Sequence, residues 1–275
     1  MQGQIIKIVS NLYFVNINNK IYECRARGKF RNDRITPTVG DYVVIDKDNN
    51  YILEILPRKN TLIRPLVSNI DQAFIITSLK RPDFSTNLLD KLLVMLEYNN
   101  IKPIIILTKN DLLNISEKKE LKKYIKYYKK IGYTVLYNFN LFRIKKLFKN
   151  KTTVFTGQTG SGKSTLLNRL NKHLNLETGE ISKALGRGRH TTRHVELINM
   201  YKGKVLDTPG FSSLDLSNLK DTDIKDSFIE FKNYNCDFKN CMHLNEKKCK
   251  VKNAVNNNKI LNTRYENYKK FIISR

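Results

Sequence analysis

The chain has 275 residues, with 50 lysines and arginines against 25 aspartates and glutamates, which gives a formal net charge of +25. This length allows two or three domains, and the absence of any apolar run of about eighteen residues excludes a transmembrane helix. The first residues lack the basic leader and apolar block of a secretory signal, so we expect a cytoplasmic protein with no membrane contact. A charge this strong attracts polyanions such as RNA, DNA or an anionic membrane, and together with local patterns it favours nucleic acid. The alternative explanation is a general compositional bias toward Lys, Asn and Ile.

The first 66 residues predict a small β-barrel. Short runs rich in β-branched and aromatic residues occur at 5–9, 12–17, 21–26, 41–46 and 51–56. Five short strands in this length favour an OB-fold. The loop RARGKFRNDR at 25–34 surrounds Phe30 with cations, which suits phosphate contact and base stacking. We therefore predict an RNA-binding domain at 1–66, and a merely solvated loop is the alternative.

Residues 67–215 predict a central α/β domain. Apolar strand-like runs at 73–77, 103–107, 133–137, 152–156, 194–200 and 204–208 alternate with helical patterns at 84–100, 116–130 and from Lys163 onward. In the second helix, Leu121, Ile125 and Tyr128 mark an apolar stripe, and lysines cover the remaining surface. This alternation is typical of a layered α/β domain.

The stretch GQTGSGKS at 157–164 matches the phosphate-binding pattern G-x-x-x-x-G-K-[ST] between an apolar strand and an apolar helix. Its glycines allow backbone N–H groups to surround phosphates, and the helix N-terminus adds a favourable dipole. Lys163 is expected to reach the β- and γ-phosphates, and Ser164 is expected to bind Mg²⁺. The predicted nucleotide-binding residues here are Gly157, Gln158, Thr159, Gly160, Ser161, Gly162, Lys163, Ser164 and Thr165.

The stretch VLDTPG at 205–210 supplies the second element of a nucleotide site. Asp207 ends an apolar strand, where a carboxylate can hold Mg²⁺ through water, and Gly210 lets the backbone approach the γ-phosphate. The tetrapeptide TKND at 108–111 comprises Thr108, Lys109, Asn110 and Asp111. Its aspartate can accept two hydrogen bonds from guanine, a pattern that adenine does not offer, so we predict GTP as the ligand.

The segment LGRGRHTTRHVEL at 185–197 is the expected mobile switch, in which Thr191 or Thr192 closes onto Mg²⁺ and the γ-phosphate. Phe211 stands where many GTPases place a water-orienting glutamine, so slow intrinsic hydrolysis is predicted. His190 is the candidate in this chain for orienting water, and a purely structural histidine is the alternative. The predicted catalytic residues are Lys163, His190, Thr191 and Thr192.

The last segment, 216–275, predicts a small helical module with a structural zinc ion. Cys236, Cys241, His243 and Cys249 are closely spaced and can complete a closed tetrahedral shell, with disulfides or free thiols as the alternatives. Helices are expected at 221–236 and 254–275, the latter with core positions at Ile260, Tyr265, Tyr268 and Ile272. Cys24, isolated on a strand, is expected to be a small core residue.

The elements of the nucleotide site follow an unusual order, because TKND precedes the phosphate-binding loop, the switch and DTPG. Ordinary GTPases run from the phosphate-binding loop to the base-reading loop, so the motif order predicts a circularly permuted GTPase. The permutation leads the γ-phosphate-sensing segment directly into the zinc module.

RGKFR, VGD, NIDQ, TKND, GQTGSGKST, GRGRHTT, DTPGF and the Cys/His cluster together resemble the ribosome small subunit-dependent GTPase A family, in that family's order and over nearly the whole chain. The resemblance implies an OB-fold, a permuted GTPase domain, a zinc domain and GTP hydrolysis stimulated by the small ribosomal subunit during its late maturation. It also implies contact with rRNA, cycling between GTP and GDP, and a role for His190 in hydrolysis. We expect a monomer. Asn138–Asn140 replaces the family's usual Ser-Ala-like pair, which predicts weaker guanine affinity.

Two other functions fit parts of the sequence. A nucleotide-gated RNA-binding scaffold with negligible hydrolysis would carry the same motifs, given Phe211. A phosphate-binding-loop ATPase or kinase is the more distant alternative, since TKND argues for guanine.

Overall fold

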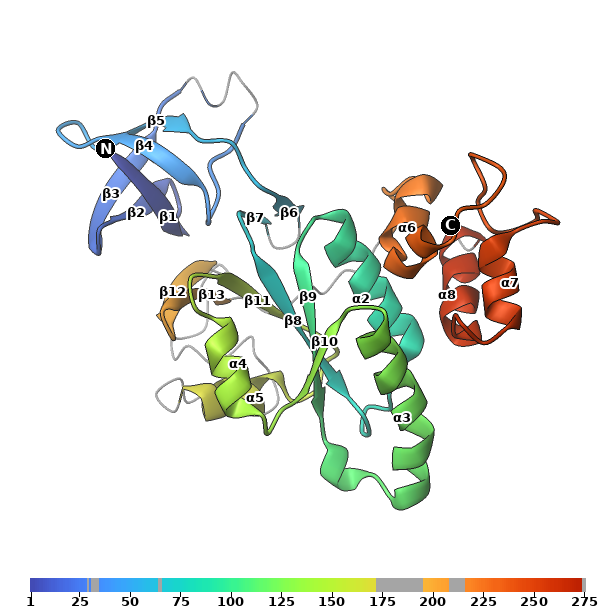
Figure 1. Cartoon of the computed structure of the whole chain (residues 1–275). Helices are drawn as coiled ribbons and strands as arrows, with labels where there is room; N and C mark the ends of the chain where they lie inside the picture. The colour runs from blue at the N-terminus through green and yellow to red at the C-terminus, as the bar shows by residue number, and fades with distance from the viewer. Residues whose placement is uncertain (29, 31–34, 64–65, 172–194, 208–215, 274–275) are drawn as a thin grey trace. The chain divides into compact units, whose positions relative to one another are not determined.

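The computed structural model describes residues 1–28, 30, 35–63, 66–171, 195–207 and 216–273 (Figure 1). The chain folds into two compact units. The first comprises Met1–Phe74 and Phe139–Ser212, and the second comprises Ile75–Asn138 and Ser213–Arg275. Within the described residues, none of the helices combines the length and the apolar character that crossing a membrane requires.

The first unit contains the predicted barrel. Its strands are β1 (Gln2–Val9), β2 (Leu12–Ile17), β3 (Lys20–Ala26), β4 (Tyr42–Asp46) and β5 (Tyr51–Ile55). They pair in the order β1-β2-β3-β5-β4, and a further β1–β4 pairing closes the barrel. Ile5, Val15, Cys24, Val43 and Ile52 are all fully buried. The period-2 pattern of each strand therefore builds the core, which confirms the OB-like barrel and the interior position of Cys24.

One expectation for the barrel loop is wrong. Phe30 is only 7 % exposed, so its ring packs into the protein and does not face solvent for base stacking. An aromatic ring in a basic loop still gains more by burying its apolar area than by standing in water. The cations Lys29, Arg31 and Arg34 of this loop lie outside the described residues.

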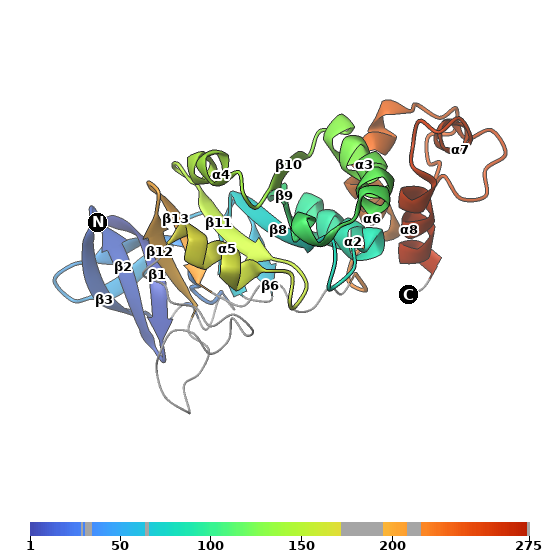
Figure 2. The same ribbon diagram turned by 90° about the horizontal axis from the view of Figure 1, so that it is seen from below.

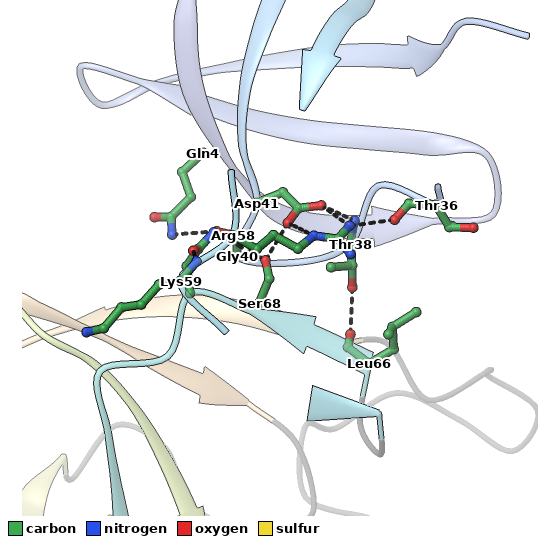
Figure 3. A network of polar contacts seen from close by, with 10 residues as sticks. Gln4, Thr36, Thr38, Gly40, Asp41, Arg58, Lys59, Leu66 and Ser68 are labelled. Atoms are coloured by element: carbon green, nitrogen blue, oxygen red, sulfur yellow. Dashed lines mark hydrogen bonds and ion pairs between the residues drawn. The ribbon is translucent and has the colours of Figure 1, made fainter. Parts of the chain in front are cut away.

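A buried polar network lies at the base of the barrel (Figure 3). The Asp41 carboxylate is completely buried and accepts two hydrogen bonds of 2.7 Å from the Arg58 guanidinium. It also accepts one bond from the Thr38 backbone N–H at 2.8 Å and one from the Ser68 hydroxyl at 2.5 Å. Each of these groups donates a hydrogen bond to the carboxylate, so the buried negative charge is compensated. The network also links the segment 36–41 to Arg58 and Ser68.

The rest of the first unit carries the phosphate-binding loop. It contains the hairpin β6 (Thr61–Ile63) and β7 (Leu66–Ser68), the helices α4 (Leu141–Leu147) and α5 (Lys163–Leu170), and the strands β11 (Thr152–Thr156), β12 (Glu196–Met200) and β13 (Gly203–Asp207). β11 pairs in parallel with β13, and β12 pairs antiparallel with both β13 and β1. The barrel and the strand before the phosphate-binding loop thus share one hydrogen-bonded sheet within this unit.

The second unit begins within β8 (Gln72–Ser78) and contains α2 (Thr86–Tyr98), β9 (Lys102–Thr108), η1 (Asn110–Leu112), α3 (Ile115–Lys130) and β10 (Thr134–Tyr137). β9 and β10 pair in parallel, as expected for buried apolar strands joined by a helix. The α2 side chains Leu89, Leu92, Leu93 and Leu96 are buried, which confirms the helical repeat. Asn114 caps α3 in a capping box with Glu117.

The C-terminal part of the second unit is helical, with α6 (Asp221–Ser227), η3 (Ile229–Asn233), α7 (Lys250–Asn256) and α8 (Asn262–Ile273) (Figure 2). The single helix predicted over 254–275 is therefore wrong. Asn258 adopts a left-handed backbone with φ 55°, and the chain turns before α8 begins. Ile260, Tyr265 and Tyr268 are buried as predicted, whereas Phe271 is buried and Ile272 only partly so.

Candidate functional site

The phosphate-binding loop has the backbone geometry that its glycines allow. Gly157, Gly160 and Gly162 have φ values of 136°, 74° and 93°. Residues with a Cβ rarely adopt a positive φ of this kind. The Ser161 backbone N–H donates to the Gln158 carbonyl at 3.1 Å and closes the turn before α5. A glycine-rich turn leading into a helix N-terminus is an anion-binding arrangement, so the loop fits a polyphosphate.

Lys163 is the first residue of α5, and its ammonium is held over the same loop. Nζ donates to the carbonyls of Gly157 at 2.6 Å and Gln158 at 2.8 Å. Burial lowers the pKa of Lys163 to about 8. The next residue, Ser164, is buried with 7 % of its surface exposed. Because the ammonium is partly desolvated, its electrostatic attraction to a polyanion at this loop is stronger than it would be in bulk water.

Asp207 is the last residue of β13, and its backbone pairs with Glu196 on β12. This position at the end of an apolar strand agrees with the sequence prediction. The remaining predicted residues of the hydrolytic apparatus, His190, Thr191, Thr192 and Gly210, lie outside the described residues, as does Phe211.

The TKND tetrapeptide lies in the second unit at the carboxyl end of β9. Thr108 is buried, and its hydroxyl donates to the Thr77 carbonyl at 3.4 Å. Lys109 has a left-handed backbone with φ 57°, and its Nζ donates to the Arg81 carbonyl. Asn110 and Asp111 enter η1, and Asp111 is exposed to solvent. The turn therefore holds the Asp111 carboxylate at the surface, where a ligand can reach it.

The four predicted metal ligands come together in the C-terminal part of the second unit. The ligand atoms of Cys236, Cys241, His243 and Cys249 all lie within 4.8 Å of one another. The His243 Nδ1 lies 3.6, 3.3 and 3.3 Å from the sulfurs of Cys236, Cys241 and Cys249, and the Cys236 and Cys249 sulfurs are 3.9 Å apart.

These distances fit a zinc tetrahedron. Zn–S and Zn–N bonds of about 2.3 and about 2.05 Å place sulfurs about 3.8 Å apart, and a sulfur about 3.6 Å from a nitrogen. Burial, reinforced by the nearby Lys225 ammonium, lowers the pKa of His243 and favours the neutral imidazole that a metal requires. The cluster is therefore compatible with a structural metal site, as predicted.

Supporting residues around the cluster were not predicted from the sequence. The Tyr265 hydroxyl donates to the His243 carbonyl at 2.6 Å, and the Tyr268 hydroxyl donates to the Met242 carbonyl. The Glu246 carboxylate accepts from the Met242 and Leu244 backbone N–H groups at 2.6 and 2.8 Å. Both tyrosines belong to α8, so that helix holds the ligand loop in place. In the sequence, Tyr265 and Tyr268 are recognisable only as core positions of a helix. That pattern does not show which carbonyls their hydroxyl groups contact.

Comparisons with known proteins agree with these features. Residues 2–52 match the family model for the RsgA N-terminal domain, and residues 55–217 match the model for the RsgA GTPase. The chain is 48 % identical over 281 residues to a protein of Latilactobacillus sakei named small ribosomal subunit biogenesis GTPase RsgA, which covers 98 % of this chain and 94 % of that one. A relative of the same name from Bacillus velezensis is 49 % identical, with 98 % and 96 % covered.

Two solved structures are also similar over nearly the full length. The crystal structure of YloQ, described as a circularly permuted GTPase, has a TM-score of 0.84 and 38 % identity, and covers 99 % of this chain and 94 % of that one. YjeQ from Thermotoga maritima has a TM-score of 0.86 and 32 % identity, with 100 % and 99 % covered. These likenesses bear out the permuted order expected from the motifs. The chain belongs to the RsgA GTPase family and is a GTP-hydrolysing enzyme.

Proposed function

We propose that this GTPase binds the small ribosomal subunit through its rRNA, hydrolyses GTP there, and assists late maturation of the subunit in the cytoplasm, acting as a monomer. The observation that carries the proposal is the similarity, over 98 % of the chain, to relatives named small ribosomal subunit biogenesis GTPase RsgA. The net charge of +25 supports a polyanionic partner, because cationic proteins release counterions when they bind nucleic acid.

In the proposed nucleotide site, one sequence motif binds the phosphates and another binds the guanine base. The backbone of 157–162 and the Lys163 ammonium hold the phosphates, and Asp111 accepts hydrogen bonds from guanine beside Thr108, Lys109 and Asn110. The left-handed φ values of the loop glycines and the exposure of the Asp111 carboxylate support these assignments. In this proposal the functional domains are 1–66, 67–215 and 216–275.

Magnesium is proposed as the cation that accompanies GTP, held by Ser164 and Asp207. When bound, Mg²⁺ supplies charge neutralisation to the phosphates. Gly210 and either Thr191 or Thr192 are proposed to contact the γ-phosphate and its metal ion, and His190 is proposed to orient the attacking water. With phenylalanine at 211, which cannot orient water, turnover is expected to depend on the ribosomal partner.

Zinc is proposed as the metal at Cys236, Cys241, His243 and Cys249. The match between the spacings of the ligand atoms and a zinc tetrahedron supports this assignment. Four protein ligands leave no position open for water, so the ion is structural.

The test is GTP turnover by the wild-type chain and by Lys163→Ala, with and without purified small ribosomal subunits, at several salt concentrations. We expect stimulation by subunits that declines steeply with salt, and no turnover above background in the variant. Turnover that subunits do not stimulate would favour the alternative of a nucleotide-gated RNA-binding scaffold. A preference for ATP would revive the ATPase alternative.

A further inference from the structure

We propose that the outer surface of α4 binds single-stranded RNA. The α4 face is defined here as Phe142, Arg143 and Lys146 of the helix together with Lys149 in the turn that follows it. The proposal deepens the proposed function and depends on it for the choice of RNA over DNA. This surface lies outside the nucleotide-binding and metal-binding residues assigned above.

The orientation of α4 is set by its inner side. Ile144 and Phe148 are completely buried, and the Phe148 ring packs edge-on against Phe74 with centroids 5.1 Å apart. The Leu147 carbonyl accepts a hydrogen bond of 2.8 Å from the Gln72 side-chain amide. Because residues four apart share one face of a helix, fixing Ile144 and Phe148 inward leaves Phe142 and Lys146 on the outside, and α4 lies at the periphery of its unit (Figure 2).

Phe142 is 70 % exposed, although a phenylalanine in a soluble protein gains free energy from burial. An exposed aromatic ring on a helix offers an apolar, flat surface to a partner.

The same face is cationic, because residues 139–151 contain no acidic residue and three of their five lysines and arginines, Arg143, Lys146 and Lys149, belong to it. Lys145 instead lies over the Tyr201 ring, and Lys151 lies 4.0 Å from an Asp71 carboxylate oxygen. The Lys146 Nζ lies 4.2 Å from the centroid of the Phe142 ring, so cation and aromatic form one contiguous surface. Arg143, Lys146 and Lys149 form no ion pair with any carboxylate in the part of the chain that the structure describes. These charges remain available to an external anion.

An aromatic ring flanked by uncompensated cations matches the two requirements of single-stranded RNA. A base can stack on Phe142, and the phosphates on either side can contact Arg143, Lys146 and Lys149. Duplex nucleic acid does not fit equally well, since its bases are stacked on one another and their faces are unavailable. The binding predicted here tolerates many sequences, because every base has a face that can stack.

The experiment measures binding of a fluorescent, unstructured RNA of about ten nucleotides to the full chain, with neither GTP nor ribosomal subunits present. Phe142→Leu keeps an apolar side chain but removes the ring, and its matched control is Tyr98→Leu, at an exposed tyrosine of α2. Lys146→Gln with Lys149→Gln is matched by Lys122→Gln with Lys126→Gln on the exposed side of α3, which removes the same charge.

We expect Phe142→Leu to weaken RNA binding about tenfold, as loss of one base stack predicts, and the Tyr98 control to change it less than about twofold. The Lys146 and Lys149 pair should reduce the slope of log affinity against log salt by about 1.4, and the α3 pair should reduce it less. Equal effects of each variant and its control would overturn the proposal. It would also be overturned if Phe142→Leu abolished only binding of an acidic peptide or only self-association.

Failure of this inference and failure of the proposed function give different results. Selective loss of RNA binding in Phe142→Leu, with a wild type that subunits do not stimulate, would contradict the function and retain the α4 site. GTP turnover that subunits stimulate, together with unchanged RNA binding in Phe142→Leu, would support the proposed function and contradict the α4 site. Basal GTP turnover without subunits should be the same in Phe142→Leu and wild type.

Discussion

Arg264 on α8 and Asp90 on α2 form a completely buried ion pair, in which Nη1 lies 2.6 Å from Oδ1. The other side of the guanidinium contacts Glu230, with Nε 2.5 Å from Oε1 and Nη2 3.1 Å from Oε2. Asp90 also accepts hydrogen bonds of 2.6 Å from the Tyr128 hydroxyl and the Asn267 amide. The network therefore joins α8 and η3 to helices α2 and α3, which flank the β9 strand that ends in TKND.

Removing the guanidinium should destabilise the second unit strongly. In Arg264→Met, Asp90 and Glu230 keep their burial and lose their cation, so we expect the free energy of unfolding to fall by about 3–5 kcal/mol. Urea denaturation followed by circular dichroism measures this change. The control is Lys269→Met on the same helix, where an exposed ion pair with Glu266 should cost no more than about 0.5 kcal/mol. Equal stability of the two variants would contradict the role given to the network.

Nucleotide affinity should depend on pH through Lys163. Burial lowers its pKa to about 8, and bound phosphates favour the charged ammonium, so binding raises that pKa and takes up a proton. Affinity should therefore be greatest below about pH 8 and should fall by up to about tenfold per pH unit above it.

Titration of a fluorescent GTP analogue from about pH 7 to about pH 9 measures this dependence, and Lys163→Arg is the control. Its guanidinium stays charged over this pH range, so the variant should lose less affinity at high pH than the wild type does. Titration of guanine itself affects both proteins equally. Identical profiles for wild type and variant would contradict the assignment of Lys163 to the phosphates.

Gly40 should not tolerate a side chain. Its φ is +96°, and a Cβ there would lie 2.1 Å from the Ser68 carbonyl oxygen. Gly40→Ala should lower the free energy of unfolding by about 3 kcal/mol, through backbone strain and displacement of the hydrogen-bonded Ser68 and Asp41. Gly28→Ala is the matched control, since no atom of the described residues lies within 4 Å of its added Cβ, and it should change stability by less than about 1 kcal/mol. Similar thermal melts for the two variants would show that the network at the barrel base is not rigid.

Metal removal should loosen the ligand loop without unfolding α8. The four ligands lie between 236 and 249, whereas Tyr268 and Phe271 of α8 share a hydrophobic core with Val94 and Tyr127 of α2 and α3. Chelation should accelerate amide exchange across 236–249 by about a hundredfold, if the free metal concentration before chelation is about a hundred times the dissociation constant. Exchange across 262–273 and the affinity for GTP should change little. Loss of protection throughout 262–273 would contradict this division.

The sequence predicted the elements whose cause is local. Three such elements are the leucine repeat of α2, the alternating strands of the barrel and the glycines of the phosphate-binding loop. Each is formed by a pattern that is visible within one short stretch of sequence. The meeting of Cys236, Cys241, His243 and Cys249 was also predictable, because their spacing within one short segment limits the possible partners.

What escaped prediction depends on residues far apart in the chain. Arginine side chains are mostly exposed, and Arg264 is buried only because it meets carboxylates 34 and 174 residues away. Phe30 was expected at the surface, since its basic neighbours do not reveal the direction of its ring. The break between α7 and α8 depends on a left-handed Asn258, a conformation that asparagine permits but does not require.

In the proposed site, TKND reads guanine for a phosphate-binding loop that follows it in the chain. The decisive measurement compares the affinities of GTP and xanthosine triphosphate in wild type and in Asp111→Asn. In the proposed site guanine donates to the Asp111 carboxylate, whereas an asparagine amide could donate to the oxygen at position 2 of xanthine. We predict that the ratio of the two affinities shifts by about a hundredfold or more toward xanthosine triphosphate. Unchanged GTP affinity in the variant would contradict the base-reading assignment and the permuted site built on it.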